Sequence, residues 1–391
     1  KAIMATFASP IIILFLGGFF LAMAATKYRL DVNLARVLIK PFGTDPKFLM
    51  LGIMIITAVF SMFMSNTATT AMMLAILTPI IATMNPQDPG KIAFLLGVPF
   101  AANIGGIGTP IGTPPNAVAL KYLTGDNTIS FSEWMTFGIP FAVILLIFAW
   151  FLLKTLYPPR EEHMELQLNG EFLRSPKALI VYVTFASTIL LWLTGKLHGM
   201  SSYVVAIIPV AVFVSTQVIT KEDLKRINWD VLWLISGGIA LGLGLEGTKL
   251  SELLIGAVPF SSFSAIIIVI IATIVAQVMA TLMSNTATAN LLLPIMATLG
   301  ASTASLGDLG GAKMLILAAA LSCSMGMALP ISTPPNALAF ATGMVDTKAM
   351  MRAGGLVSVV GVVLASEFGQ LIPYKAIMAT FASPIIILFL G

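Results

Sequence analysis

The sequence predicts an all-α polytopic membrane protein built from two inverted-topology repeats. Hydrophobic residues make up 58% of the 391-residue chain, charged residues make up 10%, and the mean hydropathy is +0.98. A soluble globular domain carries about 25% charged residues, so this chain has too few charges to cover a surface that faces water. The apolar stretches 134–157, 178–194 and 203–220 have about the length that a helix needs to cross ~30 Å of hydrocarbon. We therefore expect a multi-pass protein of the inner (cytoplasmic) membrane, with the lipid bilayer around it.

Two polar motifs occur twice in this apolar sequence, at nearly one spacing. The segment 64–69 (MSNTAT) returns at 283–288, and the segment 110–117 (PIGTPPNA) returns at 330–337 as PISTPPNA. Both copies lie about 220 positions apart and follow the same order, which indicates an internal duplication of the kind found in transporters.

The basic residues predict how the two copies are oriented. Segment 27–47 carries Lys27, Arg29, Arg36, Lys40 and Lys47, whereas its counterpart 246–252, which follows the second Gly-Gly pair, has one lysine and two glutamates. By the positive-inside rule these segments lie on opposite sides of the membrane, so the repeats are inverted. Loops 154–177 and 221–230 are also predicted to be cytoplasmic. The net charge of +4 thus comes from basic residues that are scattered in the loops between spans, and we expect no nucleic acid as a partner.

Each copy is expected to contain one re-entrant helical hairpin and one broken transmembrane helix. About 16 apolar residues precede Ser65 and a similar number follow Thr70, which is enough to reach the bilayer centre and return at 1.5 Å per residue. Lipid does not tolerate exposed loop backbone, so both hairpin tips must lie inside the protein or beside a watery cavity. The Gly- and Pro-rich motifs interrupt the span that follows each hairpin.

These features divide the chain into six predicted segments. They are 1–47 (scaffold span and interfacial segment of repeat 1), 48–158 (hairpin, broken helix and following span of repeat 1, in a transport domain), 159–177 (cytoplasmic linker), 178–262 (scaffold spans of repeat 2), 263–370 (hairpin, broken helix and last span of repeat 2, in the transport domain) and 371–391 (duplicated terminal segment).

Two irregularities accompany this division. Repeat 2 begins with two spans that have no counterpart in repeat 1, so we expect N-terminal helices to be missing. Residues 1–17 also recur without a change as 375–391, which diverged repeats do not do, and this predicts an engineered or rearranged end.

The motif regions carry hydroxyls and amides but almost no charges. Between residues 50 and 120 the only charged residues are Asp88 and Lys91, and both fall in a loop, so a proton relay is not expected. A single cysteine, Cys323, excludes a cysteine metal cluster. Helix N-termini favour anions, freed carbonyls suit Na⁺, and an asparagine amide can serve both.

Other function classes fit the residues less well. An enzyme would need a nucleophile with a base, or a metal cluster, near the midplane, and the sequence shows neither. A channel would not need two hairpins that enter from opposite faces. Polar motifs can also be simple contacts between helices, but their duplication in matched positions argues against that reading.

The paired Ser-Asn-Thr motifs and the recurring Thr-Pro-Pro segments resemble the divalent anion–sodium symporters (DASS, the INDY-type dicarboxylate transporters), over about residues 1–370. The resemblance implies a homodimer in which a transport domain moves against a fixed scaffold as an elevator. It further implies Na⁺-coupled symport of C4 dicarboxylates such as succinate, malate or fumarate, with Na⁺ as the coupling ion and no transition metal.

The resemblance also implies residue roles. The residues implied to bind the dicarboxylate are Asn66, Thr67, Thr113, Ser284, Asn285, Thr286 and Thr333. One implied sodium site consists of Ser61, Ser65, Asn66 and Gly112, and the other of Thr281, Met283, Asn285, Ala328 and Ser332.

Two alternatives within transport stay open. A Na⁺-independent dicarboxylate exchanger would replace oxygen ligands by basic groups at the cation sites, and neither motif has a nearby Lys or Arg. A Na⁺-coupled citrate or sulfate transporter would use the same architecture with another anion.

Overall fold

The computed structural model describes residues 2–164, 171–257 and 260–371, and every regular element in these ranges is a helix. The all-α prediction is therefore confirmed. Seven of the described helices are long and apolar enough to cross a membrane: α2 (Pro10–Lys27), α5 (Asn66–Thr83), α8 (Phe131–Leu156), α9 (Pro176–Leu193), α13 (Trp229–Gly247), α15 (Ala265–Leu282) and α19 (Thr347–Leu371). The predicted terminal duplication at 375–391 lies outside the described residues.

The two repeats have the same order of elements. Repeat 1 runs through α2, α3 (Leu30–Ile39), α4 (Pro46–Ser61), α5, α6 (Gly90–Gly106), α7 (Pro114–Tyr122) and α8. Repeat 2 runs through α13, α14 (Leu250–Gly256), α15, α16 (Asn285–Ser302), α17 (Gly311–Cys323), α18 (Pro334–Ala341) and α19. The remaining short or unpaired α-helices are α1 (Ala2–Ala5), α9, α10 (Gly195–His198), α11 (Ser202–Ser215) and α12 (Lys221–Leu224). The predicted hairpins and broken helices are thus present in both copies.

Local signals explain where these helices start. Asp45 caps α4, because its carboxylate accepts from the N–H groups of Lys47 at 2.8 Å and Phe48 at 3.3 Å, and Pro46 follows as the first helical residue. Serines cap α8, α9, α11 and α15 in the same way.

One span is shorter than predicted. The apolar stretch 203–220 forms a helix only as far as Ser215, because Gln217 takes a left-handed conformation with φ of 54°. The N–H of Ile219 then bonds back to the carbonyl of Phe213 at 3.0 Å, which closes the helix end. The residues after 215 are apolar enough to extend the helix but turn out of it.

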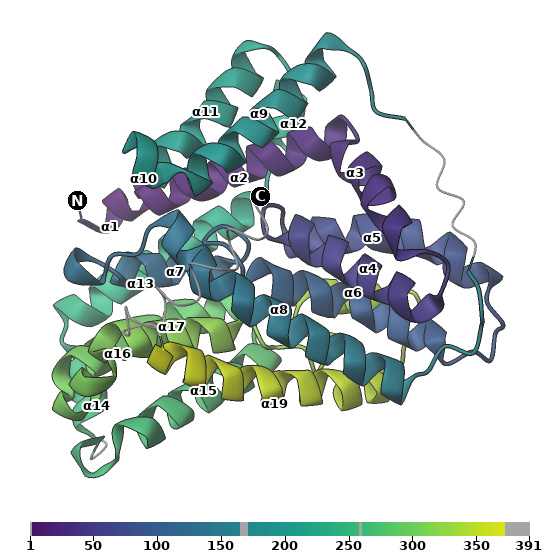
Figure 1. Ribbon diagram of the computed structural model, residues 1–391. Coiled ribbons are helices and arrows are strands. Elements are labelled where there is room, and N and C mark those ends of the chain that lie inside the picture. The colour runs from purple at the N-terminus through teal and green to yellow at the C-terminus, as the bar shows by residue number, and fades with distance from the viewer. Residues whose placement is uncertain (1, 165–170, 258–259, 372–391) are drawn as a thin grey trace.

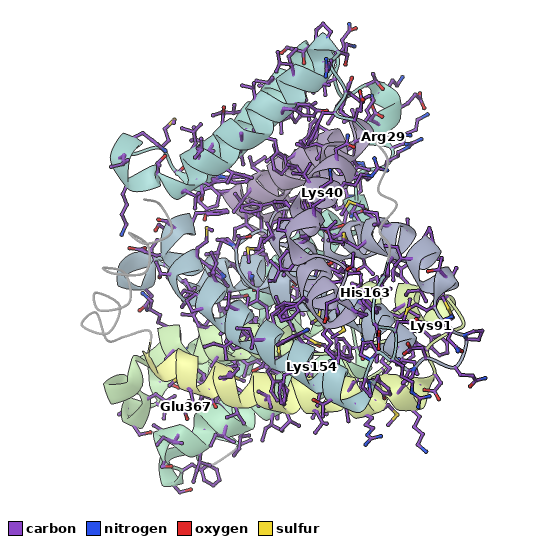
Figure 2. All side chains as sticks on the ribbon, turned by 45° about the vertical axis from the view of Figure 1, so that its right-hand side comes forward. Arg29, Lys40, Lys91, Lys154, His163 and Glu367 are labelled. Atoms are coloured by element: carbon purple, nitrogen blue, oxygen red, sulfur yellow. The ribbon has the colours of Figure 1, made fainter. Side chains whose placement is uncertain are left out.

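The helices pack around two apolar cores. One core joins α2, α9, α11 and α13 to α16 and α17, and the other joins α4, α5, α6, α8 and α19. Figure 1 shows α2, α9 and α11 side by side, above the bundle that contains α4, α6 and α8. In Figure 2 Lys91 and His163 lie at one end of that bundle and Glu367 at the other, as the predicted inverted topology requires.

The glycine pairs of the two repeats are packed differently. A Cβ on Gly17 would lie 2.3 Å from the carbonyl oxygen of Ala206, so α2 and α11 approach each other more closely than any larger residue permits. The equivalent Gly237 on α13 has no atom within 4 Å of the same position. Of these two equivalent positions, only Gly17 is therefore required by a helix–helix contact.

We expect Gly17→Ala to lower the free energy of unfolding by about 1–3 kcal/mol, because the added methyl group overpacks the contact with Ala206. Gly237→Ala is the matched control, and we expect it to be neutral or slightly stabilising because alanine favours helix. Thermal unfolding in detergent measures both. Equal melting temperatures for the two variants would contradict the packing difference.

Candidate functional site

The Ser-Asn-Thr motifs form the tips of the two helical hairpins, between α4 and α5 and between α15 and α16. Each serine caps the second helix of its hairpin. Ser65 Oγ accepts from the N–H of Ala68 at 3.1 Å, and Ser284 Oγ accepts from the N–H of Ala287 at 3.2 Å. The motif therefore encodes a helix start at the tip, where asparagine and threonine become the first two helical residues.

The Thr-Pro-Pro segments restart the two broken helices. α7 and α18 each begin with two prolines, at positions where a helix has no use for the N–H group. In repeat 2 the hydroxyl of Thr333 caps the restart by accepting from the N–H of Asn336 at 3.3 Å.

Asn116 stabilises the break in repeat 1. Its side-chain amide donates to three carbonyl oxygens that the break frees: those of Gly106 at 3.1 Å, Ile107 at 3.3 Å and Thr109 at 2.8 Å. Trp134 Nε1 donates to the Ile107 carbonyl as well, at 3.0 Å. The asparagine of the Thr-Pro-Pro-Asn motif thus donates hydrogen bonds to the backbone. Buried carbonyl groups need such donors because water does not reach them.

A cavity of about 260 Å³ lies where the two tips and the two breaks meet. All the residues predicted to bind the dicarboxylate line it: Asn66, Thr67, Thr113, Ser284, Asn285, Thr286 and Thr333. Ser65, Gly112 and Ser332, which were predicted as sodium ligands, line it too. The volume lies just below the range of ~300–1,000 Å³ that suits drug-sized ligands, so the cavity fits a small metabolite.

The remaining predicted sodium ligands lie outside the lining. Ser61 is buried behind Asn66, and Thr281 contributes its carbonyl, which accepts from Ser332 Oγ at 2.7 Å. Met283 is 41% exposed, and Ala328 is partly buried; neither lines the cavity.

Four helix N-termini converge on the cavity. α5, α16, α7 and α18 begin with Asn66, Asn285, Pro114 and Pro334, and all four residues line it. Each N-terminus carries roughly half a positive charge, and the first N–H groups of α5 and α16 have no acceptor within their own helices. Among the described lining residues there is no Lys or Arg. The donors that the described lining offers to an anion are therefore helix N-termini, amides and hydroxyls, and its one charged side chain is Asp230.

The Asn66 side chain lies in a cluster of oxygen atoms. One terminal atom of its amide is 2.6 Å from Ser61 Oγ, 3.1 Å from the Gly112 carbonyl oxygen and 3.3 Å from the Ala102 carbonyl oxygen. A Cβ on Gly106 would lie 2.6 Å from the same Asn66 atom and 2.9 Å from the Gly112 carbonyl oxygen, so a larger residue would disturb this cluster. Either the NH₂ group donates to these oxygens, or the amide oxygen joins them around a cation. An uncharged shell of oxygens fits a hard monovalent ion.

A related cluster surrounds Asn285 in repeat 2. Its amide oxygen is buried and has no hydrogen-bond partner among the described residues. A Cβ on Gly326 would lie 3.2 Å from that oxygen and 2.4 Å from the carbonyl oxygen of Ala280. This asparagine too therefore faces a glycine of the broken helix and a carbonyl of the hairpin arm, and its free oxygen fits a cation.

Sequence reasoning missed several residues of the cavity. Asn103, in the last turn of α6, is 1% exposed and donates across the repeats to Thr333 Oγ1 at 3.1 Å and to Asn336 Oδ1 at 3.3 Å. A lone amide in an otherwise apolar broken helix was a usable signal. Four further lining residues come from α2, α13 and the residue before α13, and the sequence carried no signal for them: Phe15, Phe19, Asn228 and Asp230.

The cavity continues toward loops that were predicted to be cytoplasmic. It shares Phe19, Ser65 and Asn228 with a second cavity of about 260 Å³, which Lys27 and Arg226 line. That cavity in turn shares lining residues with a groove of about 1010 Å³, which extends to Glu161 and His163 in the linker between the repeats.

A polytopic protein whose inverted repeats bring two hairpin tips and two broken helices to one buried polar cavity has the architecture of a secondary transporter. Sequence comparison is consistent with this class. Residues 1–309 match the model of the family described as citrate transporter (CitMHS), and the chain belongs to that family of transporters, which are not enzymes. The resemblance to divalent anion–sodium symporters is confirmed.

Characterised relatives cover most of the chain. The sodium-dependent dicarboxylate transporter SdcS of Staphylococcus saprophyticus is 32% identical, over 94% of this chain and 78% of its own. The sodium-dependent high-affinity dicarboxylate transporter 3 of Caenorhabditis elegans is 30% identical, over 92% of this chain and 74% of its own.

Solved transporters share the fold. The YdaH transporter of Alcanivorax borkumensis has a TM-score of 0.62 at 16% identity, over 97% of this chain and 89% of its own. MtrF of Neisseria gonorrhoeae, an antimetabolite efflux pump, has a TM-score of 0.60 at 11% identity, over 94% of this chain and 82% of its own. The predicted fold class is thereby confirmed.

We expect Asn103→Ala to lower the free energy of unfolding by about 1–3 kcal/mol, because the buried polar groups of Thr333 and Asn336 lose their donor. Cys323→Ala changes the equivalent position of repeat 2, whose side chain has no cross-repeat hydrogen bond, and serves as control. Thermal unfolding in detergent compares them. An Asn103 variant no less stable than the Cys323 variant would show that the cross-repeat bonds contribute nothing.

Proposed function

We propose that this protein is a secondary active transporter that carries C4 dicarboxylates, such as succinate, malate or fumarate, across the inner membrane together with Na⁺. The observation that carries the proposal is the single cavity at which uncharged anion donors of both repeats meet two oxygen clusters. The names of its relatives, which are sodium-dependent dicarboxylate transporters, support the same ion and the same class of substrate.

In this proposal the two tips hold the two carboxylates. Asn66 and Thr67 bind one through the N-terminus of α5, and Asn285 and Thr286 bind the other through the N-terminus of α16, next to Ser284. Thr113 and Thr333 add hydroxyls from the broken helices. Two opposed binding points suit a short molecule with a negative charge at each end, and this is the reason for choosing a dicarboxylate over a monocarboxylate.

Sodium would be held at the two oxygen clusters. One consists of Ser61, Ser65, Asn66 and Gly112, and the other is built around Asn285 and Ser332, with Thr281, Met283 and Ala328 contributing backbone. When bound, Na⁺ supplies positive charge beside a dianion whose placement in the membrane is otherwise costly. Because Asn66 and Asn285 belong to both the anion and the cation set, binding of one ligand promotes binding of the other.

The path of the cavities supports a state that is open to the cytoplasm. We assign the transport domain to segments 48–158 and 263–370, and the scaffold to 1–47 and 178–262. The transport domain then moves as an elevator to expose the cavity on the other side. Large apolar side chains on the outer faces of α9 and α11, such as Leu179, Leu190 and Val214, are more than half exposed, and they support contact with lipid or with the second subunit of a homodimer.

Two alternatives use the same site. The family's description as citrate transporter favours a Na⁺-coupled citrate carrier, with a related sulfate carrier, as the second candidate. A Na⁺-independent exchanger has less support, since no Lys or Arg lines the described part of the cavity.

The decisive experiment is uptake of labelled succinate into proteoliposomes that contain the full chain. We expect uptake with an inward Na⁺ gradient and none when K⁺ replaces Na⁺. Malate, fumarate, citrate and sulfate as unlabelled competitors rank the anions. Equal uptake in K⁺ with succinate trapped inside would establish exchange instead, and competition by citrate alone would favour the citrate carrier.

We expect Asn66→Ala and Asn285→Ala each to weaken succinate and Na⁺ binding together, by about tenfold or more, because each removes hydrogen bonds to charged ligands that are worth ~1.5–3 kcal/mol. Asn85→Ala, in an exposed loop outside the cavity, is the control. Equilibrium binding of labelled succinate at several Na⁺ concentrations gives both affinities. A variant of either asparagine with unchanged Na⁺ dependence would refute the shared-ligand arrangement.

A further inference from the structure

The two oxygen clusters differ in where one hydroxyl group comes from. In repeat 1 the hydroxyl belongs to Ser61 on the hairpin arm, and it donates to the carbonyl of Ala102 on the broken helix at 2.7 Å. Alignment of the repeats by their motifs places Ala280 at the position of Ser61 and Ser322 at the position of Ala102. Repeat 2 has thus lost the hydroxyl on the hairpin arm and gained one on the broken helix.

Ser322 is buried and its hydroxyl is free. The residue is 0% exposed in the last turn of α17, and its Oγ has no hydrogen-bond partner among the described residues. A helical serine ordinarily bonds to the carbonyl four residues earlier. A buried hydroxyl that makes no such bond leaves a polar group unsatisfied, which calls for a ligand.

The amide oxygen of Asn285 is also buried and free, and it lies against the end of the same broken helix. Its distance of 3.2 Å from a Cβ on Gly326 places it beside the segment that directly follows α17. The C-terminus of α17 carries the negative end of the helix dipole, which favours a cation and disfavours an anion at this point.

Another contact shows the same exchange of donors between the repeats. The carbonyl of Met62 in the first hairpin accepts from Thr109 Oγ1, whereas the equivalent carbonyl of Thr281 accepts from Ser332 Oγ. Thr109 and Ser332 are not at equivalent positions in the repeats. One interaction is therefore kept in both halves although its donor comes from different points of the broken helix.

We propose that the Ser322 hydroxyl is a ligand of the cation site at Asn285, where it replaces the hydroxyl that Ala280 lacks. This inference rests on the proposed function, since it concerns one of the two proposed Na⁺ sites. It assigns a side-chain ligand to a site for which the sequence had indicated mainly backbone groups around Asn285.

The test is the melting temperature of the purified full chain in detergent, measured against Na⁺ concentration with choline as the replacement ion and without substrate. A ligand at concentration c that binds only the folded state stabilises it by RT ln(1 + c/Kd), so the melting temperature rises with Na⁺ concentration once that concentration exceeds the Kd. We expect Ser322→Ala to require about tenfold more Na⁺ for the same shift, as loss of one ligand to a charged group implies. Ser324→Ala, a neighbouring serine that is also buried and free, is the control and should keep the wild-type Na⁺ dependence.

A rescue variant tests the exchange of the hydroxyl directly. Ala280→Ser combined with Ser322→Ala rebuilds the arrangement of repeat 1 in repeat 2, and we expect it to recover most of the lost Na⁺ affinity. Ser322→Cys keeps the volume but replaces a hard oxygen by a soft sulfur, so it gives the same comparison in case the alanine variant does not fold.

The outcomes separate this inference from the proposed function. If the wild-type melting temperature does not respond to Na⁺, the proposed sodium coupling itself fails. If the wild type responds and Ser322→Ala needs no more Na⁺ for the same shift in melting temperature, or is destabilised equally in Na⁺ and in choline, the hydroxyl is structural and this inference alone is overturned. A higher Na⁺ requirement together with rescue by Ala280→Ser supports it.

Discussion

Hydrocarbon offers no hydrogen bonds, and this protein interrupts its helices four times where lipid would otherwise surround them, at two hairpin tips and two breaks. The freed backbone groups must find partners inside the protein. Asn116 supplies donors to three carbonyls at one break, Thr109 ties that break to the neighbouring tip, and Ser65 caps the helix that leaves the tip. At the first turns of α5 and α16, whose first residues line the cavity, the N–H groups have no acceptor within their own helices. In the proposed function, these unsatisfied backbone groups are part of the binding site.

This origin accounts for the absence of Lys and Arg from the part of the cavity lining that the structure describes. Lys or Arg would keep a full charge in the empty carrier, and that charge would have to move with the protein through a medium of low dielectric constant. Helix ends and amides present donors without a net charge, so in the proposed function the loaded and empty forms differ little in charge. Asn103 then joins the halves, because its amide belongs to repeat 1 and both of its acceptors belong to repeat 2.

The sequence predicted the parts of the fold that short motifs encode. Ser65 and Ser284 start helices after an interruption, and the Thr-Pro-Pro segments restart the broken spans, so hairpins and breaks followed from local chemistry. The residues expected to line the cavity followed from the resemblance to divalent anion–sodium symporters. Features set by tertiary packing were not predictable. The early end of α11 depends on the conformation of Gln217, and Asp230 reaches the cavity only because α13 passes beside it.

The unequal packing of the two glycine pairs has a consequence for the direction of transport. Repeats related by a perfect inversion would give states open to either side with the same energy. Here Gly17 is in contact with Ala206 while Gly237 faces open space, and Gly238 is pressed against Asn290 while the nearest atom to a Cβ on Gly18 is 3.5 Å away. In the proposed elevator motion the contact between Gly17 and Ala206 lies within the scaffold and stays unchanged, whereas the contact between Gly238 and Asn290 joins the scaffold to the transport domain. Exchanging the two conformations would change the energy of this second contact. In the proposed function the empty carrier would therefore have a resting side, which is set by where these two helices touch and not by any solute or ion.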